Sequence, residues 1–418
     1  MVKQHVQAAQ ALAAGLHALP SAPSTFAATQ AAWRFLHNDR VGLPRLVEPL
    51  REAGRQAAAA SAASYLLLIH DWSFLSYPAH ASKADRISQN GHDGALGYDL
   101  ATVLLVDGAT GDPLAPMDLE LTTATGVVSS RPDRPTGEPA APHIDQVLAT
   151  MTAAAGWGLA KPLVHIIDRE ADGLAQFRTW AAAGHRFVVR VDANRRVRWR
   201  GRSRRLPEIV RDLQARDAFA PAGDAGPGVT VGVAETEVVY TQPGRVRRGK
   251  KRLTIPGEPL AVRLIVTQVR DADGAVTAEW LLVTNLGSEV PAAQIGRWYA
   301  WRWRIESFFK LLKSHGQQVE AWQQETGEAI AKRLAVTAMA CVLVWRLVRD
   351  ASPAGRGLAK LLMRLSGRQT KRSRPVTAPG VLAGLERLLA VLELLEHTPV
   401  EELKRLLHRA LATFGDSS

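Results

Sequence analysis

The chain has 418 residues, 46% of them hydrophobic, and carries 52 Lys and Arg against 40 Asp and Glu, a formal net charge of +12. This length provides for two or three domains with buried cores, and the positive charge favours a polyanionic partner, nucleic acid before any other. The single cysteine, Cys341, excludes an intrachain disulfide and a cysteine zinc cluster, and the apolar runs are too short for a membrane span, so we expect a cytoplasmic protein without a membrane partner.

Residues 1–60 are rich in alanine and follow a helical pattern. Residues 65–71 form a continuous apolar run that ends in Asp71, which predicts a buried central strand with the acid at its end. Strands are predicted at 99–106 and 114–121 around a hairpin turn, and 122–142 is predicted as a loop. A helix at 143–155, a buried strand that ends in Asp168, a helix at 171–183 and a strand at 186–191 follow.

This order of three antiparallel strands, helix, strand, helix and strand predicts an α/β fold with a ribonuclease-H-like core, although several α/β folds share parts of it. Residues 195–279 depart from the pattern. They begin with seven arginines between positions 195 and 205 and continue as strands, which predicts a β-rich basic insertion. We therefore expect a helical N-terminal domain at 1–60, a core at 61–194 and 280–325 interrupted by the insertion, and a helical C-terminal domain at 326–418 that could serve dimerisation.

One predicted helix, within 291–314, combines acidic, basic and aromatic side chains. At 100° per residue, a single arc of about 80° holds Tyr299, Arg302, Glu306, Lys310 and Lys313. The arc fits an acidic metal ligand surrounded by groups that bind a polyanion. It fits equally well a surface helix with ion pairs such as Glu306–Lys310, and the helix alone leaves both interpretations open.

Three acids, Asp71, Asp168 and Glu306, are separated by 97 and 138 residues, so only the fold could unite them. Clustered carboxylates raise one another's pKa unless cations neutralise them. Oxygen ligands without a His or Cys cluster favour Mg²⁺ or Mn²⁺ over zinc. Two such ions could carry out an in-line phosphoryl displacement, and the acids are therefore predicted to be catalytic and metal-binding.

Two motifs in these segments lead to a known family. Tyr299, Arg302, Glu306 and Lys313 follow the spacing Y-x2-R-x3-E-x6-K, and residues 168–172 read D-R-E-A-D. In both motifs the chain resembles the DDE transposases of the insertion-sequence-4 group, which includes the transposon-five enzyme. Residues 32–35, 73–77 and 187–190 extend the resemblance over most of the chain.

The resemblance implies a cut-and-paste DNA transposase in which the three acids hold two Mg²⁺ or Mn²⁺ ions. The implied DNA contacts are Tyr299, Arg302, Lys310, Lys313 and Arg190. Trp280 falls where the family places a tryptophan that stacks on a flipped base during hairpin formation, and an ordinary strand core residue is the equal alternative.

The implied partners are double-stranded DNA, as transposon ends and target, and a second copy of the chain in a homodimer on DNA. The implied location is the nucleoid of a bacterial cytoplasm. The N-terminal end-recognition domain lacks the relatives' additional basic first helix, so we expect it to be shortened. Two other functions stay open: a catalytically silent or end-binding-deficient DNA-binding regulator derived from a transposase, and a metal-dependent nuclease that stops at hydrolysis.

Overall fold

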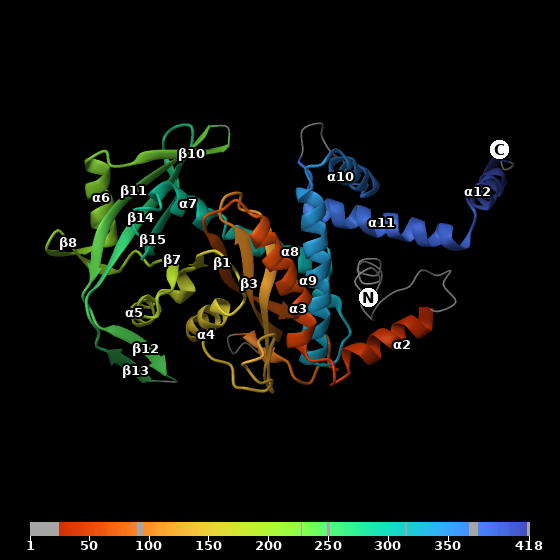
Figure 1. Ribbon diagram of the computed structural model, residues 1–418, viewed down its shortest axis with the longest axis horizontal. Helices are drawn as coiled ribbons and strands as arrows, with labels where there is room; N and C mark the ends of the chain where they lie inside the picture. Colours follow the sequence, from red (N-terminus) through yellow and green to blue (C-terminus); the bar gives the residue numbers. More distant parts are fainter. Residues whose placement is uncertain are drawn as a thin grey trace.

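The computed structural model describes residues 25–89, 95–226, 228–248, 251–313, 316–367 and 375–415. A mixed α/β architecture is built on one large sheet of 13 strands, with helices against it and further helices at one end of the molecule (Figure 1). Residues 1–24 of the predicted N-terminal domain lie outside the described residues. No helix in the described ranges combines the length and apolar character that a membrane span requires.

The part of the sheet that carries the candidate site has the spatial order β5-β4-β3-β1-β6-β7. Its strands are β1 (Leu66–Ser76), β2 (Ile87–Ser88), β3 (Leu96–Asp107), β4 (Pro113–Thr123), β5 (Gly126–Ser129), β6 (Leu163–Ile167) and β7 (Arg186–Arg190). The strands β3 and β4 are antiparallel to their neighbours, whereas β1, β6 and β7 run parallel to one another.

The prediction that 122–142 is only a loop was wrong, because β5 lies within it. Gly126, with a φ of 117°, allows the tight return that pairs β5 with β4.

The two faces of the sheet bury two hydrophobic clusters, and the strands alternate between them. In β7, for example, Phe187 and Val189 belong to one cluster and Val188 to the other. Helices α4 (His143–Ala155) and α5 (Leu174–Ala182) cover the Phe187 side, and α3 (Leu43–Ala60) covers the other. Because both faces are covered, the central strands are mainly apolar, as in residues 66–69 of β1 and 187–189 of β7.

Residues 196–284 extend this sheet instead of forming a sheet of their own. Strand β15 (Val276–Thr284) pairs with β7, and the order continues β15-β14-β11-β8-β9. The elements are β8 (Arg196–Trp199), β9 (Arg202–Arg205), α6 (Leu206–Ala215), β10 (Ala220–Gly226), β11 (Val229–Tyr240), β14 (Leu260–Arg270) and a separate pair, β12 (Gly244–Arg248) and β13 (Lys251–Ile255). Helix α6 was not predicted.

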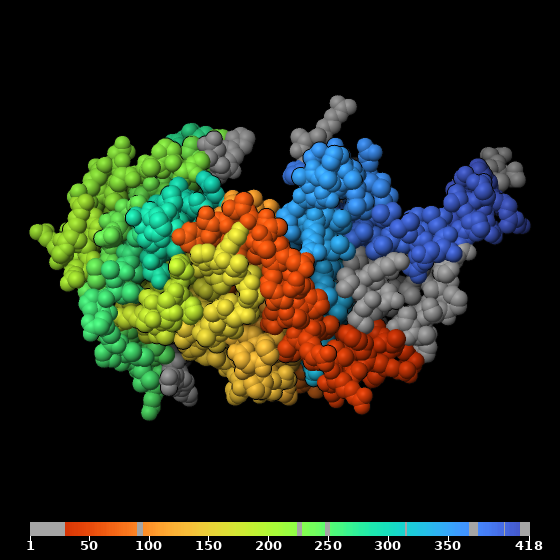
Figure 2. Space-filling model, in the orientation of Figure 1, coloured from red at the N-terminus to blue at the C-terminus, as the bar shows by residue number. Residues whose placement is uncertain are grey.

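The helices after residue 325 are α9 (Gly327–Arg349), α10 (Pro353–Leu365), α11 (Ala378–His397) and α12 (Val400–Gly415); α2 (Thr25–Leu36) lies near the other end of the chain. Helix α9 is buried along most of its length. In Figure 1, α11 runs away from the sheet and carries α12 at its far end. Figure 2 shows α11 and α12 at one end of the molecule and the β-rich part at the other.

The predicted helix at 291–314 is broken into α7 (Ala292–Ala300) and α8 (Trp303–Leu312). At the break, the backbone makes tighter i to i−3 bonds, from Arg302 N to Tyr299 O at 3.0 Å and from Arg304 N to Trp301 O at 2.9 Å. The Trp301 ring lies against Gly111, leaving no space there for a Cβ. This packing on the β3–β4 turn fixes the break.

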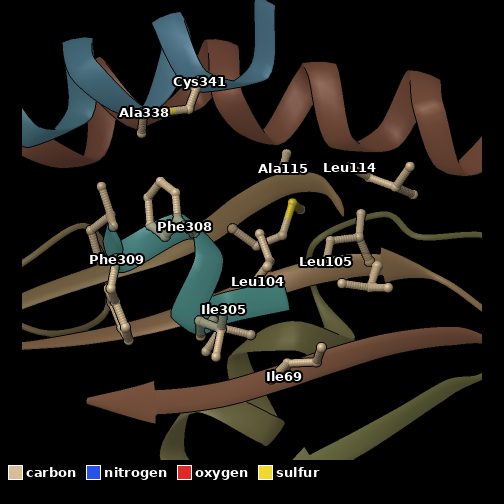
Figure 3. Close-up of a cluster of buried hydrophobic side chains, with 14 of the residues drawn as sticks. Ile69, Leu104, Leu105, Leu114, Ala115, Ile305, Phe308, Phe309, Ala338 and Cys341 are labelled. Carbon is tan, nitrogen blue, oxygen red and sulfur yellow. The ribbon is translucent and has the colours of Figure 1, made fainter. Parts of the chain in front are cut away.

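Helix α8 is attached to the core by its apolar side. Ile305 is fully buried, and Phe308 points toward Ala338 and Cys341 of α9, with its ring 5.7 Å from that of Trp345 (Figure 3). Burial of such side chains contributes roughly 1.5–3 kcal/mol each. The opposite side of α8 is thereby held in a fixed position relative to β1.

Candidate active site

Asp71 and Asp168 lie next to each other where two parallel strands separate. Strand β1 pairs with β6 only as far as His70, opposite Ile167, and the two acids are the next residues on each strand. The prediction that Asp71 ends its strand was wrong, because β1 continues along β3 to Ser76. Asp71 therefore lies where β6 separates from β1, a point that we call the fork, while β1 still pairs with β3 on its other side.

Arg302, at the start of α8, joins the three predicted acids. Its Nη1 lies 3.0 Å from Asp71 Oδ2, and its Nη2 lies 3.4 Å from Asp168 Oδ2 and 2.9 Å from Glu306 Oε1. The Arg302 side chain is only 7% exposed. Among the described ion pairs, Glu306 forms an i,i+4 pair with Arg302 and none with Lys310.

The two aspartates titrate in opposite directions. Burial, with the charges of Glu306 and Asp168, outweighs Arg302 and raises the pKa of Asp71 to about 6. Burial also acts on Asp168, but its bonds from the Arg169 amide and the Tyr299 hydroxyl, with the Arg302 charge, hold the pKa of Asp168 below its usual value. Asp168 is thus a carboxylate throughout the physiological range, and Asp71 becomes one only near neutral pH.

Aromatic and basic side chains surround Asp168. The Tyr299 hydroxyl donates to Asp168 Oδ1 at 3.0 Å. Trp280 belongs to strand β15, and the centroid of its ring lies 5.7 Å from that of the Tyr299 ring. Arg190, at the end of β7, places Nη1 4.0 Å from Asp168 Oδ1. The β15–β7 pairing therefore brings Trp280 and Arg190 to the predicted acids.

A cavity of about 370 Å³ opens over this cluster. It is lined by Asp71, Trp72, Ser73, Asp168, Arg302, Glu306, Phe309, Lys310 and Lys313. Lys313 is partly engaged, because its Nζ donates to Phe74 O and lies 3.3 Å from Glu320. The cavity lining thus combines three acids with Arg302, Lys310 and Lys313, and such cations can stabilise a phosphate.

A network of contacts beside the site was not predicted from the sequence. It is centred on His143 at the start of α4, and we call it the His143 brace. The His143 Nε2 lies 2.6 Å from Asp99 of β3 and its Nδ1 2.9 Å from Glu170 in the D-R-E-A-D run. The ring stacks on Trp72, 4.5 Å away, which follows Asp71 directly. No local pattern marks these four residues, which belong to four separate segments.

The His143 brace predicts a pH-dependent stability. Burial alone would lower the pKa of His143, but its bonds to Asp99 and Glu170 raise that pKa to about 9. The charged ring therefore stabilises the fold fully below pH 6.5, and this contribution is lost as the pH rises through 9. Because the His143 side chain is partly exposed, solvent screening reduces this stabilisation. We expect His143→Gln to lower the free energy of unfolding by about 1 kcal/mol at pH 6 and by less at pH 10, as measured in urea titrations. An equal loss at both pH values would mean that only stacking on Trp72 matters.

The three acids supply the donor chemistry for a hard divalent cation, since they offer carboxylate oxygens around one positive group. In the described part of the chain, however, no three His, Cys, Asp or Glu side chains form a cluster that could hold an ion as they stand. The Arg302 guanidinium occupies the position between Asp71, Asp168 and Glu306 instead. The residues fit a cation once that guanidinium moves aside.

A comparison with protein-family models identifies a family. A family model described as the transposase DDE domain matches residues 62–343 of the 418. No curated protein matches the chain. Among solved structures, the cryo-EM structure of the piggyBac transposase synaptic complex with hairpin DNA is similar at 10% identity and a TM-score of 0.36, over 84% of this chain and 57% of that chain.

Proposed function

The chain belongs to the transposase DDE domain family, and on that premise we propose that it is a cut-and-paste DNA transposase of the insertion-sequence-4 group. The observation that carries the proposal is the convergence of Asp71, Asp168 and Glu306 on one cationic group at the fork between β1 and β6. Of the three candidate functions, only the transposase requires the three acids, the basic side chains of the cavity and Trp280 together. The regulator does not require the acids, and the nuclease does not require Trp280.

A ribonuclease-H-like core is part of the proposal. The five main strands of this core are β1, β3, β4, β6 and β7 in chain order. In the sheet they stand in the order β4-β3-β1-β6-β7, and β3 is antiparallel to β1. The insertion at 195–279 would then position Trp280, and helical parts at 1–60 and 326–418 would serve end recognition and dimerisation. We propose homodimers on paired transposon ends in a bacterial nucleoid, on the strength of the motif resemblance.

Asp71, Asp168 and Glu306 would hold two Mg²⁺ or Mn²⁺ ions, which would supply activation of the attacking oxygen and stabilisation of the leaving one. Arg302 would then transfer its bonds from the carboxylates to a phosphate, and Lys310, two turns further along α8, would contact the same polyanion. Tyr299 would orient Asp168 through its hydroxyl bond. The sequence of reactions would be nicking at the element end, hairpin formation, hairpin opening and strand transfer into target DNA.

The test is incubation of the full chain with duplex DNA carrying the element end and Mg²⁺, with products resolved on denaturing gels. Nicked, hairpin and joined strands are expected in that order. Nicked products alone would favour the nuclease. DNA binding without any cleavage would favour the regulator.

The same assay tests Trp280 as the platform for a flipped base. Stacking of a base on an aromatic ring is worth roughly 1–3 kcal/mol, so Trp280→Ala should slow hairpin formation by about 5- to 150-fold and leave nicking unchanged. Trp280→Phe, which keeps a ring, should retain most of the hairpin rate. Equal losses in nicking and hairpin formation in Trp280→Ala would instead assign the residue to the strand core.

A further inference from the structure

The hairpin of β8 and β9, at the last position of the sheet, presents three arginines on one side. Arg196 stands directly opposite Arg205, and Arg198 stands opposite Ser203. Directly paired residues of antiparallel strands project to the same side, so Arg196, Arg198 and Arg205 share one surface, which we call the arginine face. All three are exposed. Val197 and Trp199 project to the other side and are buried.

Within the described ranges, no carboxylate forms an ion pair with the arginine face. Neighbouring arginines outside it do have carboxylate partners: Arg204 lies 3.5 Å from Glu208, and Arg195 lies 2.9 Å from Asp172. None of the ion pairs among the described residues includes a member of the arginine face. Like charges directly opposite each other destabilise a sheet, so folding alone does not explain this arrangement.

The hairpin beneath the face is held rigidly. Its turn is a two-residue one, with positive φ at Arg200 (48°) and Gly201 (76°). Trp199 is buried, and its Nε1 donates to Thr236 at 3.0 Å. Arg198 pairs with Val239 of β11. The guanidinium groups therefore project from a fixed edge and not from a free loop.

The arginine face lies far from the cavity. Five strand spacings separate β6 from β8 along the sheet, which at about 4.8 Å each is roughly 24 Å. That span corresponds to the rise of about seven base pairs of duplex. A side chain at this distance cannot contact the phosphate held at Asp168, but it can contact others on the same duplex.

We propose that the arginine face binds the phosphate backbone of duplex DNA at a second position, remote from the reacting phosphodiester. The proposal rests on the proposed function for the identity of the polyanion. Three exposed arginines on one side of the hairpin can contact several phosphates of a duplex, and the release of condensed counterions favours such contacts. The face would thus hold DNA in register without reading its sequence.

The experiment measures binding of the full chain to a fluorescent 40-base-pair duplex by anisotropy, in EDTA, over a range of KCl concentrations. The test variant is Arg196→Gln/Arg198→Gln/Arg205→Gln. With about 0.9 counterions released per phosphate contact, the slope of log affinity against log salt should become shallower by about 2.7. Arg196→Lys/Arg198→Lys/Arg205→Lys should keep the original slope, because it keeps the charges.

The matched control removes three exposed cations from α10, as Arg356→Gln/Lys360→Gln/Arg364→Gln, and should leave the slope unchanged. The triple Gln variant should melt no lower than the original chain, since it loses only like-charge repulsion. At saturating DNA, its nicking rate should match that of the original chain, while the half-saturating DNA concentration rises.

An unchanged slope in the triple Gln variant, or an equal change in the α10 control, would overturn the inference and leave the proposed function standing. A slope change with duplex RNA but not with duplex DNA would also overturn it. If the original chain does not bind duplex DNA at all, the proposed function and the inference fail together.

Discussion

Replacing Asp168 by asparagine is expected to abolish Mg²⁺-dependent strand cleavage, with a loss on the order of a thousandfold or more. A bound metal contributes several kcal/mol of charge stabilisation in such reactions, and each 1.36 kcal/mol corresponds to a factor of ten. Asp168 is the acid whose pKa is held low, so it supplies full negative charge at every working pH. The measurement is the single-turnover nicking rate on end-containing duplex.

The Asp168→Asn chain should still fold, because the amide oxygen can accept the bonds from the Arg169 amide and the Tyr299 hydroxyl. Asp145→Asn, which removes an exposed carboxylate of α4, is the matched control and should cleave normally. Cleavage that survives in Asp168→Asn, with a normal melting temperature, would contradict the assignment of the three acids.

Local patterns in the sequence were sufficient to predict the elements around the site. The apolar runs before Asp71 and Asp168 predicted two buried strands because strands covered on both faces need apolar side chains throughout. Ile305 and Phe308 recur at helical spacing, and both are buried. These features depend on residues close together in the chain, and periodicity reports such features directly.

Features that depend on distant partners were not predictable in this way. Strand β1 continues past Asp71 because β3 still pairs with it, and the break between α7 and α8 depends on Trp301 packing against Gly111. The His143 brace likewise joins segments that share no pattern. The arc drawn on one continuous helix grouped Arg302 with Glu306, but it could not show that the Arg302 guanidinium also contacts Asp71 and Asp168, which belong to distant segments.

Replacing Arg302 by glutamine is expected to change metal binding and cleavage in opposite directions. In the DNA-free chain, the guanidinium contacts all three acids, so a divalent ion has to displace it. A charge-assisted hydrogen bond contributes about 1.5–3 kcal/mol, and loss of one such competitor should tighten Mn²⁺ binding by at least about tenfold. Cleavage should nevertheless fall by about a hundredfold, because the cavity loses a donor to the phosphate.

Mn²⁺ binding to Arg302→Gln is best measured by calorimetry at pH 8, without DNA. Arg302 lowers the pKa of Asp71, which is already raised to about 6, so the variant's Asp71 needs the higher pH to be ionised. The melting temperature offers a second readout. Without metal it should fall, since three carboxylates lose their counter-charge, and Mn²⁺ should raise it more in the variant than in the original chain.

Arg304→Gln is the matched control on the same helix. Its guanidinium Nε donates to Gly111 O and has no ion pair with the three acids among the described contacts, so Mn²⁺ affinity should not change. Weaker Mn²⁺ binding in Arg302→Gln would show that Arg302 positions the acids instead of competing with the metal. Tighter Mn²⁺ binding with lost cleavage would show that Arg302 neutralises the acids when no metal is bound and contacts the phosphate during cleavage.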